Sequence, residues 1–277
     1  LVVPFERVRL TYRQLDERSN QVAHLFRSLR LGHGDTIAIC MENRAEFFDL
    51  VWGAQRSGLI YVAISSRLTA AEMDYILADS GAQALFSTNY LGDTLDQLQS
   101  PVNRYLVGGE RAGWTPFASA LVDMPTTPVA DQRAGTDMLY SSGTTGQPKG
   151  VRLPLPEDPD ITAFNALTQI AVAAFLFSGN SIYLSPAPLY HAAPLRWCTS
   201  VHRLGGTVVV MEKFDPELAL AAIEKYGVTT SQWVPTHFAR MLKLPEEVRR
   251  RYDVSTLTSA VHAAAPCPVP TKEAMIN

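Results

Sequence analysis

Residues 36–87 read TIAICMENRAEFFDLVWGAQRSGLIYVAISSRLTAAEMDYILADSGAQALFS, and this stretch decides the fold class. Short apolar runs lie at residues 36–41, 60–64 and 84–87, and they suit strands that are buried on both faces. The two segments between these runs carry apolar residues at helical spacing. Strands and helices that alternate in this way predict βαβ units, and therefore a largely parallel sheet with helices on both faces.

Capping residues mark the helices of this region. Asn43 with Glu46 is expected to open the first intervening helix. Thr69 with Glu72 forms a capping box that opens the second helix, and Gly81 is expected to close it.

A further helix is expected before the first strand. Thr11 and Gln14 form a capping box at its start, and Val22 and Phe26 lie on its apolar face. Gly32 is the expected end of this helix.

Beyond residue 90 the α/β pattern is interrupted and then resumes. Glycines and prolines break it up to residue 133, which predicts a boundary between two parts of the chain. Strands are expected afterwards at residues 138–140, 181–184, 207–211 and 229–234. An Asp215-Pro216-Glu217 cap and Gly227 should bound the helix between the last two strands. We therefore expect two stacked α/β subdomains, comprising residues 1–130 and 131–277.

The composition limits the functional classes. The chain has 24 Lys and Arg against 27 Asp and Glu, and this net charge of -3 argues against a partner such as nucleic acid. Cys40, Cys198 and Cys267 are far apart, which argues against a zinc site or a disulfide framework and favours a reducing cytoplasm.

One apolar segment, residues 161–177, is shorter than the ~20 residues that a membrane span needs. Asp160 as an N-cap and Gly179 as a stop predict a helix over this segment. We expect it to be buried between protein layers, with no membrane span in the chain.

Residues 140–151 read YSSGTTGQPKGV, a composition suited to binding phosphate. Three glycines permit sharp turns that bring backbone N–H groups close to an anion. Hydroxyl groups and one positive charge accompany them, from Ser141, Ser142, Thr144, Thr145 and Lys149. By composition alone, a surface hairpin turn is the alternative. The order of residues is not that of a Walker A loop, because Lys149 is followed by Gly150, and a dinucleotide-binding G-x-G-x-x-G is absent.

Residues 141–150 resemble the signature of the adenylate-forming superfamily, which runs approximately S/T-S-G-T-T-G-x-P-K-G. This superfamily includes acyl-CoA synthetases, adenylation domains of peptide synthetases and beetle luciferases. Later segments are similar to further motifs of the family in the same order, namely PLYH at 188–191, VPT at 234–236 and AAAP at 263–266. The resemblance covers nearly all of the chain, and it implies part of the large N-terminal α/β domain of such an enzyme.

The resemblance implies an ATP-dependent acid–CoA ligase. A carboxylate would attack ATP to give acyl-AMP and pyrophosphate, and coenzyme A would then displace AMP. Lys149 and the loop hydroxyls would hold the β- and γ-phosphates, while Mg²⁺ would bridge phosphate oxygens near Thr144. His191 would orient the carboxylate or gate the acyl pocket. Thr144, Lys149 and His191 are therefore the expected catalytic residues.

Two sets of binding residues follow from the same resemblance. ATP would contact Ser141, Ser142, Gly143, Thr144, Thr145, Gly146, Lys149, Ala264, Ala265 and Pro266. A fatty or aromatic acid would contact Tyr190, His191, Trp233, His237, Ala263 and Ala264. Packing in the core is the alternative for Trp233 and His237. Alanines 263 and 264 stand where the family usually has glycines, and each narrows the space beside the ligands by a methyl group.

Several motifs of the family would follow Asn277, including Y-G-x-T-E, the ribose-binding aspartate and the C-terminal domain with the adenylation lysine. We therefore expect the chain to be an incomplete N-terminal portion that is inactive alone. Two alternatives stay open: an adenylation domain that loads a carrier protein, and a non-catalytic module that binds ATP or an acyl ligand.

Overall fold

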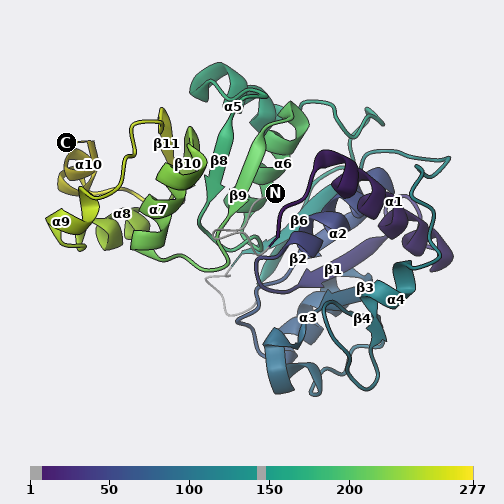
Figure 1. Ribbon diagram of the computed structural model, residues 1–277. Helices are drawn as coiled ribbons and strands as arrows, with labels where there is room; N and C mark the ends of the chain where they lie inside the picture. The colour runs from purple at the N-terminus through teal and green to yellow at the C-terminus, as the bar shows by residue number, and fades with distance from the viewer. Residues whose placement is uncertain (1–7, 142–147, 277) are drawn as a thin grey trace. The chain divides into compact units, whose positions relative to one another are not determined.

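The computed structural model describes residues 8–141 and 148–276, which form two compact α/β units (Figure 1). One unit comprises residues 10–163, and the other is built mainly from residue 164 onward. Each unit has a sheet dominated by parallel strands with helices packed on it, so the predicted fold class is confirmed.

Seven strands form the sheet in the described part of the first unit. In spatial order they are β5 (Thr115–Pro116), β4 (Asn103–Leu106), β3 (Ala82–Ser87), β1 (Thr36–Cys40), β2 (Ile60–Ala63), β6 (Thr136–Ser141) and β7 (Lys149–Arg152). Neighbouring strands are parallel except β6 and β7, which are antiparallel. The parallel pairs arise because a helical crossover returns the chain to the same end of the sheet.

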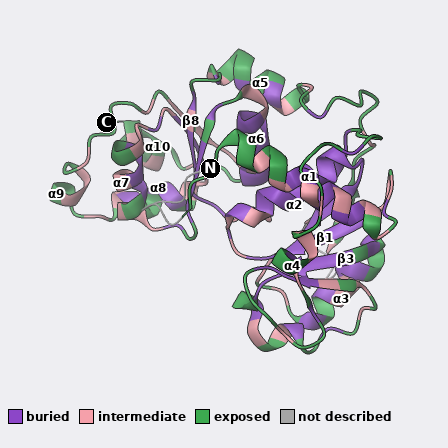
Figure 2. Ribbon diagram, turned by 45° about the vertical axis from the view of Figure 1, so that its right-hand side comes forward, coloured by how far each residue is buried: buried purple, intermediate pink, exposed green. Residues whose placement is uncertain are grey.

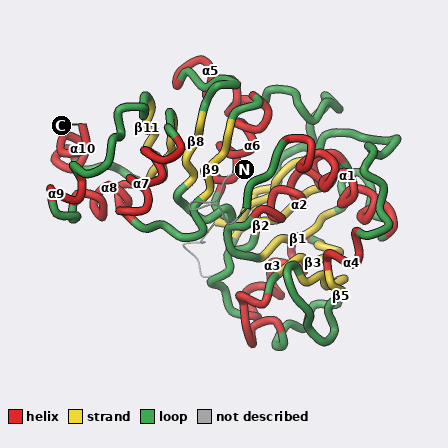
Figure 3. Tube along the Cα trace, viewed as in Figure 1, coloured by secondary structure: helices red, strands yellow, loops and turns green. Residues whose placement is uncertain are grey.

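Helices cover both faces of this sheet (Figure 3). The helical segments are α1 (Tyr12–Ser28), α2 (Ala45–Arg56), α3 (Ala70–Ser80), the 3₁₀ segment η1 (Asn89–Leu95) and α4 (Phe117–Leu121). α1 packs on α2, and α2 packs on β1 and β2. On the α3 face, Met73 and Leu77 share a core with Ala38 of β1 and Val62 of β2. These strands are buried throughout, as predicted for strands covered on both faces.

The capping boxes predicted for α1 and α3 are confirmed. The hydroxyl of Thr11 accepts the N–H of Gln14, and the hydroxyl of Thr69 accepts the N–H of Glu72. Gly81 ends α3 in the left-handed conformation with φ 67°.

The predicted end of α1 at Gly32 is wrong. The helix ends at Ser28, and Arg30 adopts the left-handed conformation with φ 61°. The N–H of Leu31 then donates to the carbonyl of Phe26, which completes a Schellman-type ending without a glycine.

The predicted start of α2 at Asn43 also differs from the structure. The helix begins at Ala45 with Arg44 as N-cap, and no side-chain cap bond is formed. Glu46 binds the guanidinium of Arg44 at 2.8 Å, so an ion pair at the first turn replaces the expected cap.

Four parallel strands form the sheet in the described part of the second unit, in the order β11 (Ser259–His262), β10 (Thr230–Trp233), β8 (Ile182–Ser185) and β9 (Thr207–Val210). Its helices are α5 (Ala166–Phe175), α6 (Ala192–Leu204), α7 (Pro216–Tyr226), α8 (Pro235–Leu242), α9 (Glu246–Arg249) and α10 (Val269–Ile276). The predicted cap of α7 is confirmed, because Asp215 accepts the N–H groups of Glu217 and Leu218, and Gly227 closes the helix with φ 60°.

The apolar helix predicted over residues 161–177 is shorter and more exposed than expected. Asn165 caps α5 in place of Asp160, and Leu176 ends it in the left-handed conformation. Within α5 only Thr168 and Ala171 are buried, since the helix packs on α6 through one side, and Figure 2 shows the other side exposed. None of the helices in the described ranges has the length and apolar character to cross a membrane.

The division between the units lies further along the chain than the expected boundary at residue 130. It falls between Ala163 and Phe164. The reason is that β6 pairs in parallel with β2, with Thr136 opposite Ile60, and β7 then pairs with β6. The loop that was expected in the second subdomain therefore extends from the first sheet.

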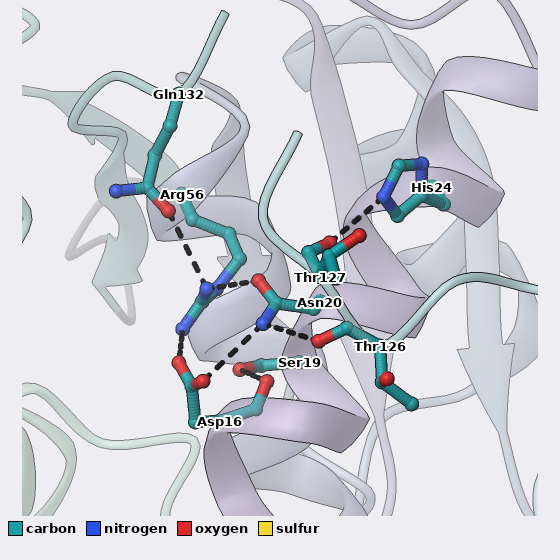
Figure 4. A network of polar contacts seen from close by, with 8 residues as sticks. All are labelled: Asp16, Ser19, Asn20, His24, Arg56, Thr126, Thr127 and Gln132. Carbon is teal, nitrogen blue, oxygen red and sulfur yellow. Dashed lines mark hydrogen bonds and ion pairs between the residues drawn. The ribbon is translucent and has the colours of Figure 1, made fainter. Parts of the chain in front are cut away.

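The segment that leads into β6 is fastened to α1 and α2 by a polar network (Figure 4). Asn20 donates to the carbonyl of Thr126 at 2.8 Å, and His24 Nε2 lies 2.9 Å from the carbonyl of Thr127. The guanidinium of Arg56 also contacts Gln132 at 3.4 Å. Side chains from two helices thus hold the chain immediately before the strand that precedes the predicted phosphate loop.

Candidate functional site

The predicted phosphate loop joins β6 to β7. Ser141 is the last residue of β6, and it lies opposite Lys149, the first residue of β7. Lys149 is exposed, so its ammonium group is available to an anion. The side chain of Ser141 and the loop residues Ser142, Gly143, Thr144, Thr145 and Gly146 lie outside the described residues.

The position of this loop in the sheet suits ligand binding. β6 runs parallel to β2, so the loop leaves the carboxyl end of a parallel strand. Ligands of open α/β sheets bind at that edge. The stem is an antiparallel hairpin, as the composition-based alternative expected, and a hairpin with a lysine at its base is compatible with an anion cradle.

A pair of residues at the stem was missed by the sequence analysis. Tyr140 lies opposite Gly150, and the Tyr140 hydroxyl donates to Asp79 Oδ2 of α3 at 2.6 Å. Burial, reinforced by the bond to Asp79, raises the pKa of Tyr140, so the hydroxyl stays protonated and able to donate. Asp79 is 61 residues away along the chain, and no local sequence signal connects the two.

The motifs of the second unit gather at one edge of its sheet. Its strands are parallel, and residues 188–191, 234–236 and 263–266 follow the carboxyl ends of β8, β10 and β11. The N–H of Ala263 donates to the carbonyl of Trp233 at 3.2 Å, which joins segment 263–266 to the last residue of β10, immediately before segment 234–236. Sequence-distant candidates for the acid site therefore share one edge of the four-stranded sheet.

Tyr190 and His191 lie immediately before α6. His191 is the N-cap residue of the helix and is exposed, and the two ring centroids are 4.6 Å apart. The backbone N–H of His191 donates to the carbonyl of Pro188. This turn presents the imidazole at the edge of the sheet, as a role toward a ligand would require.

Trp233 and His237 pack in the core, which was the alternative left open for both. Trp233 is 1% exposed, and its indole N–H donates to the hydroxyl of Ser231. The His237 ring lies 4.2 Å from that of Phe214, and its Nδ1 accepts the N–H of Val234. Burial, with the neighbouring Arg240 guanidinium, lowers the pKa of His237 to about 4, so the ring is neutral at neutral pH.

The segment 263–266 leaves β11 on the exposed side of the sheet. Ala263 is half-buried, while Ala264, Ala265 and Pro266 are exposed. Ala264 has φ 72°, a left-handed conformation that glycine adopts readily and alanine does not. The alanine at a position where the resembling family usually has glycine therefore carries backbone strain.

The predicted magnesium site depends on Thr144 and on the phosphates of ATP. Among the described residues no group of three or more His, Cys, Asp or Glu side chains could hold a metal ion. Thr144, the residue predicted to lie near Mg²⁺, is outside the described residues. Magnesium therefore stays a prediction that depends on ATP bringing its own phosphate ligands.

The two largely parallel sheets, with a hairpin at the carboxyl edge of the first, define an α/β protein. The chain belongs to the AMP-binding enzyme family, which matches it over residues 1–277. A fatty acid–[acyl-carrier-protein] ligase, ScoC of Streptomyces coeruleorubidus, is 32% identical over 266 residues, covering 93% of this chain and 49% of the relative. A feruloyl-CoA synthase of an Amycolatopsis species is 30% identical over 94% of this chain and 50% of its own length.

Solved structures agree with this assignment. The N-terminal domain of FACL13 from Mycobacterium tuberculosis, in an inhibitor-bound crystal structure, is 26% identical with a TM-score of 0.82. That match covers 99% of this chain and 68% of the other. The chain spans about half the length of the two relatives above, 49% and 50%.

Proposed function

We propose that this chain is the nucleotide-binding part of an enzyme that activates a carboxylic acid as its acyl-adenylate at the expense of ATP. The observation that carries the proposal is the hairpin stem, where Ser141 and Lys149 close a glycine- and hydroxyl-rich loop at the carboxyl edge of the seven-stranded sheet. Membership of the AMP-binding enzyme family supports the same reading.

In this proposal Lys149 and the loop hydroxyls bind the β- and γ-phosphates of ATP. The carboxylate attacks the α-phosphorus, and pyrophosphate leaves with the negative charge that Lys149 helps to stabilise. Thr144 would stand beside the Mg²⁺ that accompanies ATP. The protein's contribution is positioning and charge stabilisation, so an exposed ammonium group at the base of the hairpin suits this step.

The acid would lie at the carboxyl edge of the four-stranded sheet. His191 is the group there best suited to orient a carboxylate, because it is exposed at the start of α6. Tyr190, Ala263 and Ala264 would border the acyl group, and Ala264, Ala265 and Pro266 the nucleotide. Trp233 and His237 would support this wall from the core. Because the relatives include a fatty-acid ligase and a feruloyl-CoA synthase, the acid is proposed to be fatty or aromatic.

Coenzyme A is the proposed acceptor of the acyl group. A carrier protein is the second candidate, and one observation favours it: the relative that is 32% identical is a fatty acid–[acyl-carrier-protein] ligase. Acceptor choice can be tested on the full-length protein by supplying acyl-AMP with either coenzyme A or a phosphopantetheinylated carrier and measuring thioester formation.

The nucleotide proposal is tested by titrating the chain with Mg-ATP in a calorimeter and repeating the titration with Lys149→Ala. Loss of a charge-assisted contact should weaken binding by roughly tenfold or more. Lys213→Ala is the matched control, because Lys213 is an exposed lysine in the second unit, outside the hairpin. Equal affinity of the wild type and Lys149→Ala would refute the phosphate role of Lys149.

Acid activation is tested separately by ATP–pyrophosphate exchange with panels of fatty and aromatic acids. Exchange that depends on one of these classes would support the proposed chemistry and would show that this chain suffices for it. If the chain binds Mg-ATP without exchange, the same assay on the full-length protein decides, and no exchange there with any carboxylic acid would refute acid activation.

A further inference from the structure

The side chain of Tyr140 connects the stem of the loop to a helix. Tyr140 lies on β6, next to Ser141, and its hydroxyl reaches Asp79 in the last turn of α3 at 2.6 Å. Met138, two residues earlier on the same face of β6, belongs to the core between the sheet and α3, and Tyr140 packs against that core. The ring therefore rests on packed structure, and its hydroxyl donates to the carboxylate of Asp79 beside the side chain of Ser80.

The strand opposite Tyr140 is shaped to accept this ring. Tyr140 pairs with Gly150 of β7. A Cβ at residue 150 would lie 2.8 Å from Tyr140 Cζ and 2.3 Å from Met138 Cε, so the absence of a side chain at Gly150 lets the ring cover the backbone of β7. One tyrosine thus covers both strands of the hairpin next to the loop.

The position of Asp79 in α3 is not favoured by the local helix electrostatics. It lies in the last turn of α3, where the helix dipole favours basic residues, and that turn contains none. The bond from Tyr140 supplies a tertiary reason for an acidic residue at this place. Residues that oppose local preference are often retained for a functional site.

β7 is an edge strand, so an attachment beside the loop adds to the contacts it makes with β6 and α3. It is the last strand in the order of its sheet, and Lys149, Val151 and Arg152 are exposed. β7 pairs with β6 along its length. At the end of β7 away from the loop, the side chain of Arg152 also donates to the carbonyl of Gly34 at 3.3 Å. Edge strands with exposed side chains have low local stability.

We propose that Tyr140 and Asp79 act together as a positioning pair that holds the stem of the phosphate loop, and with it Lys149, against α3. This inference rests on the proposed phosphate role of Lys149. Neither residue touches the nucleotide in this proposal. Their bond restricts the motion of the strand that begins with Lys149, so that less ordering is left for ATP to impose on binding.

The test compares Tyr140→Phe and Asp79→Ala with the wild type by amide hydrogen exchange and by Mg-ATP titration of the whole chain. Each variant should speed exchange at the β7 amides by about three- to tenfold and weaken Mg-ATP binding by a similar factor. Asp79→Asn keeps an oxygen that can accept the tyrosine proton, so it should restore most of both properties. The double variant should be no worse than either single variant, because one bond is lost in all three.

Tyr90→Phe is the matched control. Tyr90 lies in η1 of the same unit and is 68% exposed, and its replacement removes a tyrosine hydroxyl that is not part of the Tyr140–Asp79 pair. Wild-type exchange and affinity are expected for it, with the melting temperature recorded for every variant to identify global destabilisation.

The outcomes separate this inference from the proposed function. Unchanged exchange in both Tyr140→Phe and Asp79→Ala overturns the positioning pair. Faster exchange with unchanged Mg-ATP affinity overturns it as well, because the pair would then serve the hairpin alone. A third outcome is faster exchange in the variants when the wild type binds no Mg-ATP, either as this chain or at full length. That outcome rejects the phosphate role of the loop and thus the proposed function. The attachment of the stem to α3 would still stand.

Discussion

Arg56 Nη2 of α2 lies 2.8 Å from Asp16 Oδ1 of α1, and Arg56 Nη1 donates to Asn20 Oδ1 in the next turn of the same helix (Figure 4). The side chain of Arg56 is only 6% exposed. Its guanidinium joins the two helices, and Asn20 passes the connection on to the carbonyl of Thr126. A buried cation is thus paired through both Nη atoms, which is the condition under which burial is tolerated, while its Nε has no hydrogen-bond partner among the described residues.

Arg56→Ala is expected to lower the free energy of unfolding by about 3 kcal/mol, because it removes several bonds and leaves the buried amide of Asn20 without this partner. The matched control is Arg250→Ala, where Arg250 and Glu246 form an i,i+4 pair with side chains 79% and 62% exposed. Arg250→Ala should lower the free energy of unfolding by less than about 0.5 kcal/mol. Denaturant unfolding measures both, and equal effects would contradict the structural role of Arg56.

Gly135 is expected to tolerate no side chain, although its sequence context is unremarkable. A Cβ there would lie 2.3 Å from the carbonyl oxygen of Leu59 and 2.7 Å from that of Ala54. Both obstacles are backbone atoms, so Gly135→Ala should destabilise the chain by about 2 kcal/mol or more and disturb the start of β6. Gly32→Ala is the control, since nothing lies within 4 Å of a Cβ at residue 32. Thermal and chemical unfolding of both variants check the difference.

Ala264→Gly is expected to raise the free energy of unfolding by about 1 kcal/mol. At φ 72° the alanine Cβ crowds the backbone, and glycine removes that strain. The neighbouring Ala263→Gly should instead lower stability by roughly 0.5–1 kcal/mol, because a glycine there only adds freedom to the unfolded chain. The pair is compared by chemical denaturation, and a destabilising Ala264→Gly would show that the conformation of residue 264 is unstrained.

Asp49 should make stability depend on pH. Its side chain is fully buried, with Oδ2 2.6 Å from Arg18 Nη2. Burial raises the pKa of Asp49 from 3.8 to about 7, and the nearby Glu46 adds to this, while Arg18 and Arg44 oppose it. Since the folded-state pKa is the higher one, the folded chain binds the additional proton between these values. The proton bound by Asp49 therefore stabilises the folded chain fully below about pH 4, and this stabilisation is lost as the pH rises to about 7.

Asp49→Asn should therefore gain stability relative to the wild type as the pH rises. We expect the difference in free energy of unfolding between variant and wild type to increase by about 3 kcal/mol from roughly pH 4.5 to pH 8. Asp123→Asn, at an exposed carboxylate, should show a much smaller change. A constant difference between Asp49→Asn and the wild type across this range would mean that Asp49 is ionised throughout.

Local patterns predicted many elements because their causes are local. The capping boxes at Thr11 and Thr69 depend on residues three positions apart, and both form as expected. The predicted C-terminal end of α1 differs from the structure because Arg30 adopts a left-handed conformation. The predicted start of α2 differs because Arg44 binds Glu46 in place of a helix cap. In the first case a backbone conformation, and in the second a side-chain ion pair, overrode a statistical preference.

The boundary between the units differs from its sequence prediction for another reason. Glycines and prolines interrupt the α/β pattern before residue 133, but sheet membership depends on which strands pair. β6 joins the first sheet through β2, whose Ile60 lies opposite Thr136. That pairing joins residues distant in the chain and leaves no mark in the sequence around either one.

Short-range spacing was enough to predict the α/β class, the order of most strands and helices, and the glycine-rich loop that led to the AMP-binding family. Tertiary packing was needed to show that Trp233 and His237 belong to the core and that β6 and β7, the strands flanking the loop, belong to the first sheet. The same holds for the bond between Tyr140 and Asp79. Burial and long-range contact depend on how elements pack against one another, and residues 61 positions apart meet only when the chain has folded.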